Sequence, residues 1–358
     1  MRAAVAGGGR IAVREVPEPA PGPGEALLRV LACGVCGSDL HHFAGRAADA
    51  APLVYGHEFA AEVLAYGPEA SGPPPGTRVC AVPQAGGEIV GLSERYAGGF
   101  AERVVVAADM LDPVPGGVAT DHAALTEPLA VGVHAVAAAE IRPADAALVI
   151  GCGPIGLAVI AALKATPGRD VPVVAADLSP ARRVLAARMG ADEVVEPDTG
   201  DPYARLGAYG VELAASAASL RAPGDGPGAV IFECVGVPGM LGRALAGAPP
   251  HARVVVAGVC MEPDTVLPVV GIVKELRLSF VFGYTRREFT RALDAIASGA
   301  VDPAPMITGT VGLDGVAGAF TALADPDRHA KILVHPPAGT GAAGPAGARA
   351  GGAGEEAG

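Results

Sequence analysis

The sequence lacks tryptophan altogether, and aromatic residues make up only 4% of its 358 residues. Its buried cores must therefore be built mainly from Ala, Val, Leu and Ile. Hydrophobic residues reach 51% and charged residues 18%, which is a globular composition and excludes a disordered chain. The length is sufficient for two domains, each with its own core.

The sequence also lacks a basic cluster that could offset its formal net charge of -12. A protein of this charge repels polyanions, so we exclude a nucleic-acid partner. The six Cys residues are scattered, and a chain of this size needs no disulfides, which favours a reducing cytoplasm. The first residues carry charges and have no long apolar core, so we expect no signal peptide.

A membrane span is missing as well, although residues 146–163 are uncharged and just long enough to cross a bilayer. Gly151, Gly153, Pro154 and Gly156 interrupt the middle of this segment. A buried strand, a glycine turn and a buried helix explain it better than a single helix does. We therefore expect a soluble protein.

The first hundred residues predict short strands with no helix-length apolar period. Together they suggest a small antiparallel barrel or sandwich. The expected strands are two within 1–16, and one each within 25–32, 56–68, 73–83 and 98–108.

The pattern changes near residue 120. A helix is expected over 121–140, interrupted by Pro128. Apolar strands then alternate with helical segments, which is typical of βαβ units on a parallel sheet. The expected strands are 146–150, 171–176, 229–233 and 253–257, and the expected helices are 155–165, 180–190 and 238–247. A helix over 287–299 and a strand over 331–334 follow, and the low-complexity residues 337–358 should be disordered.

A glycine motif of the form G-x-G-x-x-G follows the strand at 146–150. Gly151 would make the turn, Gly153 would let a pyrophosphate approach the backbone, and Gly156 would allow close helix packing. The helix that begins at Pro154 and Ile155 would offer its free N–H groups to the phosphates. The motif therefore predicts a dinucleotide site.

The next strand ends in Asp177, which lies 177 − 156 = 21 residues after the last glycine. This is close to the spacing of about 20 expected for the acid that binds a ribose diol. Its charge should repel a 2′-phosphate, which favours NAD over NADP. Arg182 and Arg183 lie nearby and could soften that preference.

Residues 31–42 gather a thiol, a hydroxyl, a carboxylate and imidazoles within a few positions. Cys33 and Cys36 alone would also suit a redox pair or half of a zinc knuckle. A zinc ion that polarises an alcohol needs about three protein ligands and an open position. Later in the chain, His57-Glu58 and Glu127 offer further ligands.

Together these segments resemble the zinc-dependent medium-chain dehydrogenase/reductase family, and most of all its sorbitol, threonine and butanediol dehydrogenase branch. The similarity extends from the first strand to about Pro336, with the matching segments in family order. These segments are 34–41, 56–63, 98–102, 127–135, 151–156 and 232–236.

The resemblance implies a GroES-like, partly open β-barrel catalytic domain over 1–128 and 283–336. It also implies a Rossmann domain, a doubly wound parallel sheet that binds NAD, over 129–282. The family forms homodimers or homotetramers, so we expect one of these. Such an enzyme would act on a small secondary alcohol or polyol, or on the matching ketone.

Site residues can be transferred by position from the same resemblance. Cys36 and His57 look like zinc ligands, and Glu58 looks like a ligand or a close neighbour that exchanges with water. Glu127 stands where the polyol branch has Glu and other alcohol dehydrogenases have a Cys ligand. It would bind zinc directly or contact a zinc-bound water.

Ser38 and His41 match the pair that passes the alcohol proton to solvent, and Asp39 matches the acid that orients the ligand histidine. We expect structural roles for Cys33, and also for His42 and His134.

Many family members carry a second, structural zinc on four closely spaced Cys residues. The corresponding region, 80–99, holds only Cys80. We therefore predict one catalytic zinc per chain and no structural zinc.

Two alternatives to a zinc dehydrogenase stay open at this stage. One is a zinc-free NAD(P)-dependent reductase of the same superfamily. The other is a non-catalytic dinucleotide-binding protein in which Cys33 and Cys36 sense redox state. The loop 43–55 and the segment 274–289 are expected to shape the substrate pocket, and neither contains a phosphate clamp.

Overall fold

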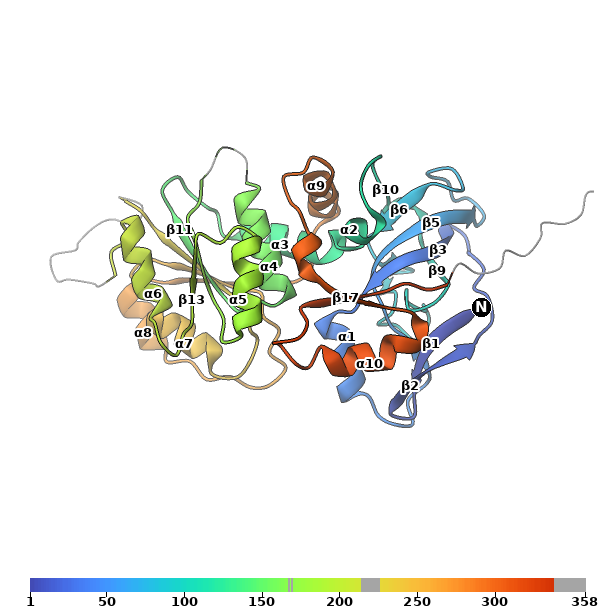
Figure 1. Ribbon diagram of the computed structural model, residues 1–358, viewed down its shortest axis with the longest axis horizontal. Helices are drawn as coiled ribbons and strands as arrows, with labels where there is room; N and C mark the ends of the chain where they lie inside the picture. The colour runs from blue at the N-terminus through green and yellow to red at the C-terminus, as the bar shows by residue number, and fades with distance from the viewer. Residues whose placement is uncertain (167, 169, 214–225, 338–358) are drawn as a thin grey trace, which may run out of the picture.

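The protein is described from a computed structural model that covers residues 1–166, 168, 170–213 and 226–337. Two β regions lie side by side with helices between and around them (Figure 1). Apart from residue 337, the predicted low-complexity tail lies outside the described residues. Within the described part, no helix is both long and apolar enough to cross a membrane.

One β region is mainly antiparallel, as predicted. A seven-stranded sheet has the order β10-β6-β5-β3-β18-β17, and β9 also pairs with β3. Its strands are β3 (Glu25–Gly34), β5 (Glu58–Tyr66), β6 (Arg78–Ala81), β9 (Arg103–Ala107), β10 (Leu111–Pro113), β17 (Ile307–Val311) and β18 (Lys331–Val334). Since β18 pairs with β3, the end of the described chain returns to its beginning.

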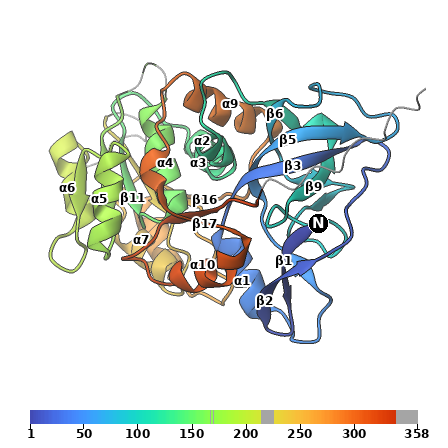
Figure 2. The ribbon, with the colours of Figure 1, turned by 45° about the vertical axis from the view of Figure 1, so that its right-hand side comes forward.

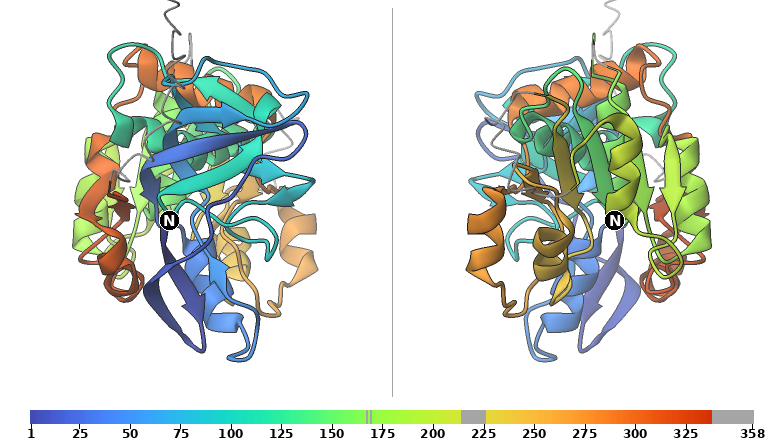
Figure 3. Two further views of the ribbon diagram at one scale, coloured as in Figure 1. Left: turned by 90° about the vertical axis from the view of Figure 1, so that its right-hand side faces the viewer. Right: turned by 90° about the vertical axis from the view of Figure 1, so that its left-hand side faces the viewer.

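Two smaller β elements flank this sheet (Figure 3). The first is a three-stranded sheet in the order β2-β1-β4, formed by β1 (Arg2–Gly7), β2 (Arg10–Glu15) and β4 (Leu53–Val54). The second is a hairpin of β7 (Gln84–Ala85) and β8 (Glu88–Ile89).

The other β region is a six-stranded parallel sheet in the order β13-β12-β11-β14-β15-β16. The order reverses between β11 and β14, and in doubly wound sheets the carboxyl ends of the strands at such a switch point are where a dinucleotide binds. The predicted doubly wound sheet is therefore confirmed. Its strands are β11 (Ala146–Ile150), β12 (Val173–Ala176), β13 (Glu193–Val195), β14 (Ala229–Glu233), β15 (Arg253–Val256) and β16 (Arg277–Phe280).

Both faces of this sheet are buried at its central strands β11, β12, β14 and β15, whereas the edge strand β16 is exposed. Along β11, Ala147 and Val149 face one apolar cluster, whereas Leu148 and Ile150 face another. This explains why the strand is continuously apolar in the sequence. The covering helices are α4 (Pro154–Lys164), α5 (Pro180–Arg188), α6 (Pro202–Arg205), α7 (Met240–Gly247) and α8 (Pro268–Lys274).

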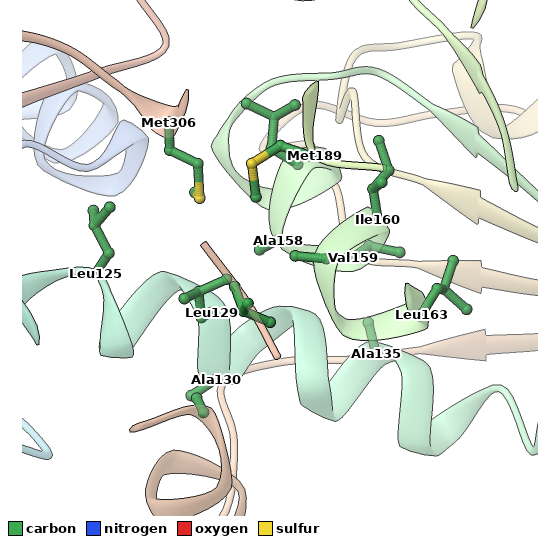
Figure 4. Close-up of a cluster of buried hydrophobic side chains, with 14 of the residues drawn as sticks. Leu125, Leu129, Ala130, Ala135, Ala158, Val159, Ile160, Leu163, Met189 and Met306 are labelled. Atoms are coloured by element: carbon green, nitrogen blue, oxygen red, sulfur yellow. The ribbon is translucent and has the colours of Figure 1, made fainter. Parts of the chain in front are cut away.

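Helices α2 (Thr120–Ala124), α3 (Thr126–Ala138) and α9 (Arg286–Ala297) lie together between the two β regions (Figure 2). The helices α3 and α4 are so close that a Cβ added at Gly132 would lie 2.5 Å from the backbone carbonyl of Ala158. Leu125, Leu129 and Ile160 belong to the apolar cluster drawn in Figure 4. This cluster connects the antiparallel region to the parallel sheet.

The structure corrects three sequence-based expectations. The helix over 121–140 is broken at Leu125 and not at Pro128, because Pro128 lies in the first turn of α3, where its missing N–H costs little. The sequence predicts a short helix that begins at Asp39, with Ser38 or Asp39 near its cap, whereas the observed helix α1 (Gly37–Gly45) begins earlier and has Cys36 as its N-cap. The elements α8, β16, β17 and α10 (Val316–Ala322) were not predicted.

Candidate active site

Cys36 lies two residues after the end of β3 and is the N-cap residue of α1. The buried Asp39 accepts a hydrogen bond from the Cys36 backbone N–H at its Oδ2, over 3.0 Å. This reciprocal capping arrangement fixes the cysteine at the positive end of the helix dipole. The sulfur of a cysteine thiolate is a ligand that zinc prefers, so Cys36 is a candidate metal ligand.

His57 immediately precedes β5 and lies against the same helix turn. Its Nδ1 is 3.2 Å from Asp39 Oδ1, and its Nε2 is 3.3 Å from Ser38 Oγ. Burial alone would lower the pKa of His57, but the neighbouring Asp39 and Cys36 raise it well above its usual value. Asp39 therefore holds both the Cys36 backbone and the His57 ring.

Glu58 is fully buried and paired with a residue that the sequence did not point to. Lys331 Nζ donates hydrogen bonds to Glu58 Oε1 and Oε2, at 2.7 and 2.6 Å. The pocket for this carboxylate exists because Gly34 has no side chain, since a Cβ there would overlap Glu58 Oε2. Burial lowers the pKa of Lys331, but the neighbouring Glu58 more than offsets this, so that the pKa of Lys331 is raised.

Potential ligand atoms of Cys36, His57 and Glu58 all lie within 4.8 Å of one another. Glu127, at the start of α3, does not belong to this trio, but its charge interacts with His57 and Glu58. Burial raises the pKa of Glu127 to about 7. Tyr284 donates a hydrogen bond to Glu127 Oε1 over 2.9 Å, and is the second site residue that the sequence did not identify.

The other predicted residues are not drawn into this cluster. His41 lies exposed on α1, one turn beyond Ser38. His42 is hydrogen-bonded to Tyr55 over 2.9 Å, and His134 to Glu288 over 3.0 Å.

The remaining cysteines of this region are packed into the interior. Cys33 is buried in β3, and burial raises the pKa of its thiol well above the usual value. A thiol of this kind is a poor redox partner for Cys36. Cys80 is also buried and donates to the carbonyl of Ala123 over 3.0 Å.

The glycine motif has the geometry that a dinucleotide loop needs. Gly151 has a φ of +89°, a conformation that favours glycine. A Cβ on Gly156 would overlap the carbonyl oxygen of Gly151, so only glycine lets the helix approach the strand so closely. Gly153 is the N-cap of α4, and Pro154 and Ile155 form its first turn. The N–H groups at this helix end are oriented to bind phosphates.

Asp177 lies just after β12, beside the glycine loop. Its two carboxylate oxygens accept hydrogen bonds from the backbone of Cys152 over 2.7 Å and of Ser179 over 2.8 Å. The Arg182 guanidinium lies next to Gly153, 3.7 Å from where a Cβ would be. Arg183 is used structurally, because it donates to the carbonyls of Asp177 and Leu178.

A single divalent cation would suit the first of these two sites. Cys36, His57 and the carboxylates supply the sulfur, nitrogen and oxygen ligands that zinc prefers. His57 Nδ1 and Asp39 Oδ1 are buried and 3.2 Å apart, and neither has another polar partner, so Asp39 is the side chain that can orient the ring. Burial raises the pKa of Glu127 although His57 and Lys331 lie nearby and Tyr284 donates a hydrogen bond to it, so a bound cation would stabilise its carboxylate form.

Two family models match the chain: the alcohol dehydrogenase GroES-like domain over residues 22–116, and the zinc-binding dehydrogenase over residues 154–298. The (R,R)-butanediol dehydrogenase of Bacillus subtilis (strain 168) is 30% identical over 351 residues, which cover 91% of this chain and 96% of that protein. The chain belongs to the zinc-dependent medium-chain dehydrogenase/reductase family.

Two further relatives agree with this assignment. Sorbitol dehydrogenase of Ovis aries is 30% identical, with 88% of this chain and 91% of that protein covered. The crystal structure of a putative zinc-binding dehydrogenase from Sinorhizobium meliloti 1021, bound to NADP, superimposes with a TM-score of 0.78 at 28% identity, covering 94% of this chain and 99% of that one. The chain is an oxidoreductase that uses zinc and a nicotinamide dinucleotide.

Proposed function

We propose that this chain is a zinc- and NAD-dependent dehydrogenase that interconverts a secondary alcohol or polyol and the matching ketone. The observation that carries the proposal is the convergence of Cys36, His57 and Glu58 within 4.8 Å, in a chain that also holds a dinucleotide loop. Relatives named for butanediol and sorbitol favour a substrate with neighbouring hydroxyl groups.

Cys36, His57 and a carboxylate of Glu58 or Glu127 would hold one zinc ion per chain. Glu58 belongs to the trio of converging ligand residues, and each of its oxygens keeps a lone pair beside the hydrogen bond from Lys331. We infer that there is no structural zinc, since Cys80 is the only cysteine between residues 80 and 99. Three protein ligands would leave a fourth position for the substrate oxygen.

When bound, zinc supplies Lewis acidity that lowers the pKa of the substrate hydroxyl, and the nicotinamide accepts the hydride. Ser38 is placed to take the hydroxyl proton at its Oγ, which lies 3.3 Å from His57 Nε2. His41 is one helical turn away and exposed, so it would deliver that proton to solvent. Asp39 takes no proton in this scheme and keeps the His57 ring oriented.

The dinucleotide would lie with its pyrophosphate over Gly151, Gly153 and Gly156, at the N-terminus of α4. We propose NAD over NADP, because the Asp177 carboxylate would accept hydrogen bonds from a ribose diol and repel a 2′-phosphate. Arg182 would face the same part of the cofactor, since its Nε is buried without a hydrogen-bond partner. Because a structurally similar dehydrogenase was crystallised with NADP, the preference for NAD has to be measured directly.

We place the catalytic domain over residues 1–128 and 283–336, and the dinucleotide-binding domain over 129–282. The substrate would then bind between them. Tyr284, just beyond this boundary, touches Glu127 and supports that location. We also propose that the enzyme works in the cytoplasm, because all six cysteines are free.

An exposed apolar surface at the edge of the parallel sheet supports a homodimer. It lies on α8, the edge strand β16 and the loops around them. Its side chains are Val259, Met261, Leu267, Val269, Ile272, Val273, Phe280 and Phe282. An apolar edge strand of this kind favours pairing with a second copy of itself.

A substrate panel tests the proposed reaction. Vicinal diols, sugar alcohols and simple secondary alcohols are each assayed with NAD and with NADP, before and after zinc is removed by dialysis against a chelator and then restored. We expect turnover with NAD that is lost on removal and recovered with zinc. Turnover that survives complete metal removal would indicate a zinc-free reductase. Tight NADH binding without turnover of any substrate would indicate a redox sensor.

A further inference from the structure

Glu233 is a buried acidic residue at the carboxyl end of β14. Its Oε1 accepts hydrogen bonds from the backbone N–H groups of Val235 and Gly236, over 2.7 and 2.9 Å. A buried carboxylate needs such donors, because water no longer solvates it. Since these donors belong to the backbone that follows the strand, Glu233 fixes the conformation of the β14 loop (residues 234–239), which leads to α7.

The same residue also ties the β14 loop to the β15 loop (residues 257–267), which follows the neighbouring strand of the sheet. The main-chain carbonyl of Glu233 accepts hydrogen bonds from the N–H groups of Ala257 and Gly258, both over 2.9 Å. A Cβ added at Gly258 would lie 2.4 Å from the backbone nitrogen of Gly236 and 2.9 Å from Glu233 Oε2. The two loops therefore meet backbone to backbone around the Glu233 carboxylate.

The β14 loop also lies against the dinucleotide loop (residues 151–156). The N–H of Cys234 donates a hydrogen bond to the carbonyl of Ile150 over 2.8 Å. A Cβ added at Gly151 would lie 2.7 Å from Val235 Cγ2. The strands that precede the two loops, β11 and β14, are the pair at which the strand order reverses. Glu233 therefore shapes a loop at the place where doubly wound sheets bind a dinucleotide.

The position of Asp177 indicates which end of the cofactor would reach the β14 loop. A doubly wound dinucleotide fold has two halves, and each half takes one mononucleotide. Asp177 follows β12, in the half formed by β13, β12 and β11, and its proposed partner is the adenosine ribose. The half formed by β14, β15 and β16 is then left for the nicotinamide. Val235 and Val237 on the β14 loop are 41% and 49% exposed, and they offer an apolar surface to the nicotinamide ring.

We propose that Glu233 is a positioning residue that holds the β14 and β15 loops in the conformation that orients the nicotinamide for hydride transfer. It acts through the backbone of Val235 and Gly236, and not by touching the reacting atoms. This role rests on the proposed dehydrogenase function. Hydride transfer depends on such positioning, because a displacement of about 1 Å lowers a rate roughly a hundredfold.

The affinities for NADH and for ADP-ribose, which lacks the nicotinamide, test this role without turnover. In the wild type we expect NADH to bind more tightly than ADP-ribose and the emission of the bound reduced nicotinamide to be blue-shifted. Glu233→Ala removes the acceptor oxygen, so NADH affinity should fall roughly tenfold, as for the loss of a buried hydrogen bond. Its ADP-ribose affinity should stay near the wild-type value.

Kinetic measurements on three variants at this position extend the test. With the best substrate of the panel, Glu233→Ala should lower kcat roughly a hundredfold and leave the KM for that substrate near the wild-type value. Glu233→Gln keeps an acceptor oxygen in the same place, so it should retain most of the NADH affinity and of kcat. Glu233→Asp keeps the charge but withdraws the oxygens by one methylene. It should show a smaller loss of the same kind as Glu233→Ala, and it serves if the Ala variant does not fold.

Asp201→Ala is the matched control. Asp201 Oδ1 accepts a hydrogen bond from the backbone N–H of Tyr203, two residues later, over 2.9 Å, much as Glu233 does from Val235. Asp201 follows β13, however, at the opposite side of the parallel sheet. This variant should lower the free energy of unfolding in urea and leave the affinities for NADH and ADP-ribose unchanged.

The outcomes separate the positioning role from the proposed function. A wild-type ratio of NADH to ADP-ribose affinity in Glu233→Ala and Glu233→Asp would overturn the positioning role and leave the dehydrogenase proposal intact. The same role is overturned if Glu233→Gln is as impaired as Glu233→Ala, or if the wild type binds NADH no more tightly than ADP-ribose. A wild-type protein that binds neither compound would overturn the dinucleotide site itself, and with it the role of Glu233.

Discussion

The candidate metal site (Cys36, His57 and Glu58, with Glu127 nearby) and the dinucleotide loop (residues 151–156) are held in place by different forces. The loop is built from consecutive residues, and its shape is set by backbone sterics at Gly151 and Gly156. The cluster takes side chains from distant segments and is set by buried charges, as in the contact between Glu58 and Lys331. The dinucleotide loop should therefore lose its cofactor affinity when a side chain is added to one of its glycines. The candidate metal site should lose its metal when a charged group or a ligand is removed.

The largest loss of activity is expected from a substitution at the candidate metal site. Cys36→Ala removes the sulfur ligand, and kcat/KM should fall roughly a thousandfold, because metal polarisation supplies several kcal/mol of transition-state stabilisation. NADH affinity, followed by fluorescence titration, should stay near the wild-type value. A variant that loses NADH binding in parallel with activity would contradict the independence of the two sites.

Gly156→Ala should affect the dinucleotide loop and leave the candidate metal site intact. The added Cβ would overlap the carbonyl of Gly151, and neither backbone can move without distorting the start of α4. We expect about 3 kcal/mol of lost dinucleotide affinity, or roughly a hundredfold, with the metal content unchanged. Gly318→Ala is the control, because a Cβ there meets no atom within 4 Å. Normal NADH affinity in Gly156→Ala would rule out this steric account.

A smaller effect is expected from Asp177→Ala. The substitution removes the acceptor for the Cys152 and Ser179 N–H groups and the charge opposite a 2′-phosphate. The ratio of kcat/KM for NAD to that for NADP should fall about tenfold, a change of about 1.4 kcal/mol. Asp198→Ala, at an exposed position on the same part of the chain, should leave the ratio unchanged. An unaltered ratio in Asp177→Ala would remove Asp177 from the cofactor site.

The smallest effect is expected from Cys33→Ala, three residues before the proposed ligand Cys36. The Cys33 thiol is buried and its pKa is raised well above the usual value, so it should bind no metal. Removing it should lower the free energy of unfolding by about 1 kcal/mol through lost packing, as measured by urea denaturation. Zinc content and kcat should not change. Loss of zinc in this variant would show that the two cysteines act together.

The glycine loop could be predicted almost completely from the sequence. Its members are consecutive, and the requirement for glycine follows from local geometry that the sequence displays. The turn around Cys36 was predicted only in part: a short helix was expected there, but its N-cap is Cys36, with Asp39 at the capping-box position three residues later. The mainly antiparallel region and the parallel sheet followed from the spacing of apolar segments, whereas the doubly wound topology was implied by the family resemblance.

Lys331 and Tyr284 could not be predicted in the same way. Each contacts a carboxylate that is more than a hundred residues distant in sequence, and no local period marks either of them. Lys331 is the first residue of an otherwise apolar strand, and nothing in the local sequence marks it as a buried partner of Glu58. The helix break at Leu125 was predicted at Pro128 instead. Proline is tolerated in the first turn of a helix, and the start of α3 at Thr126 became known only from the structure.

The central claim is that one zinc ion, held through Cys36 and His57, serves a dinucleotide bound at a separate loop. Metal analysis of the purified wild-type protein, Cys36→Ala and Gly156→Ala tests it most directly. The account predicts about one zinc per chain in the wild type and in Gly156→Ala, and none in Cys36→Ala. A zinc content in Cys36→Ala equal to that of the wild type would contradict it.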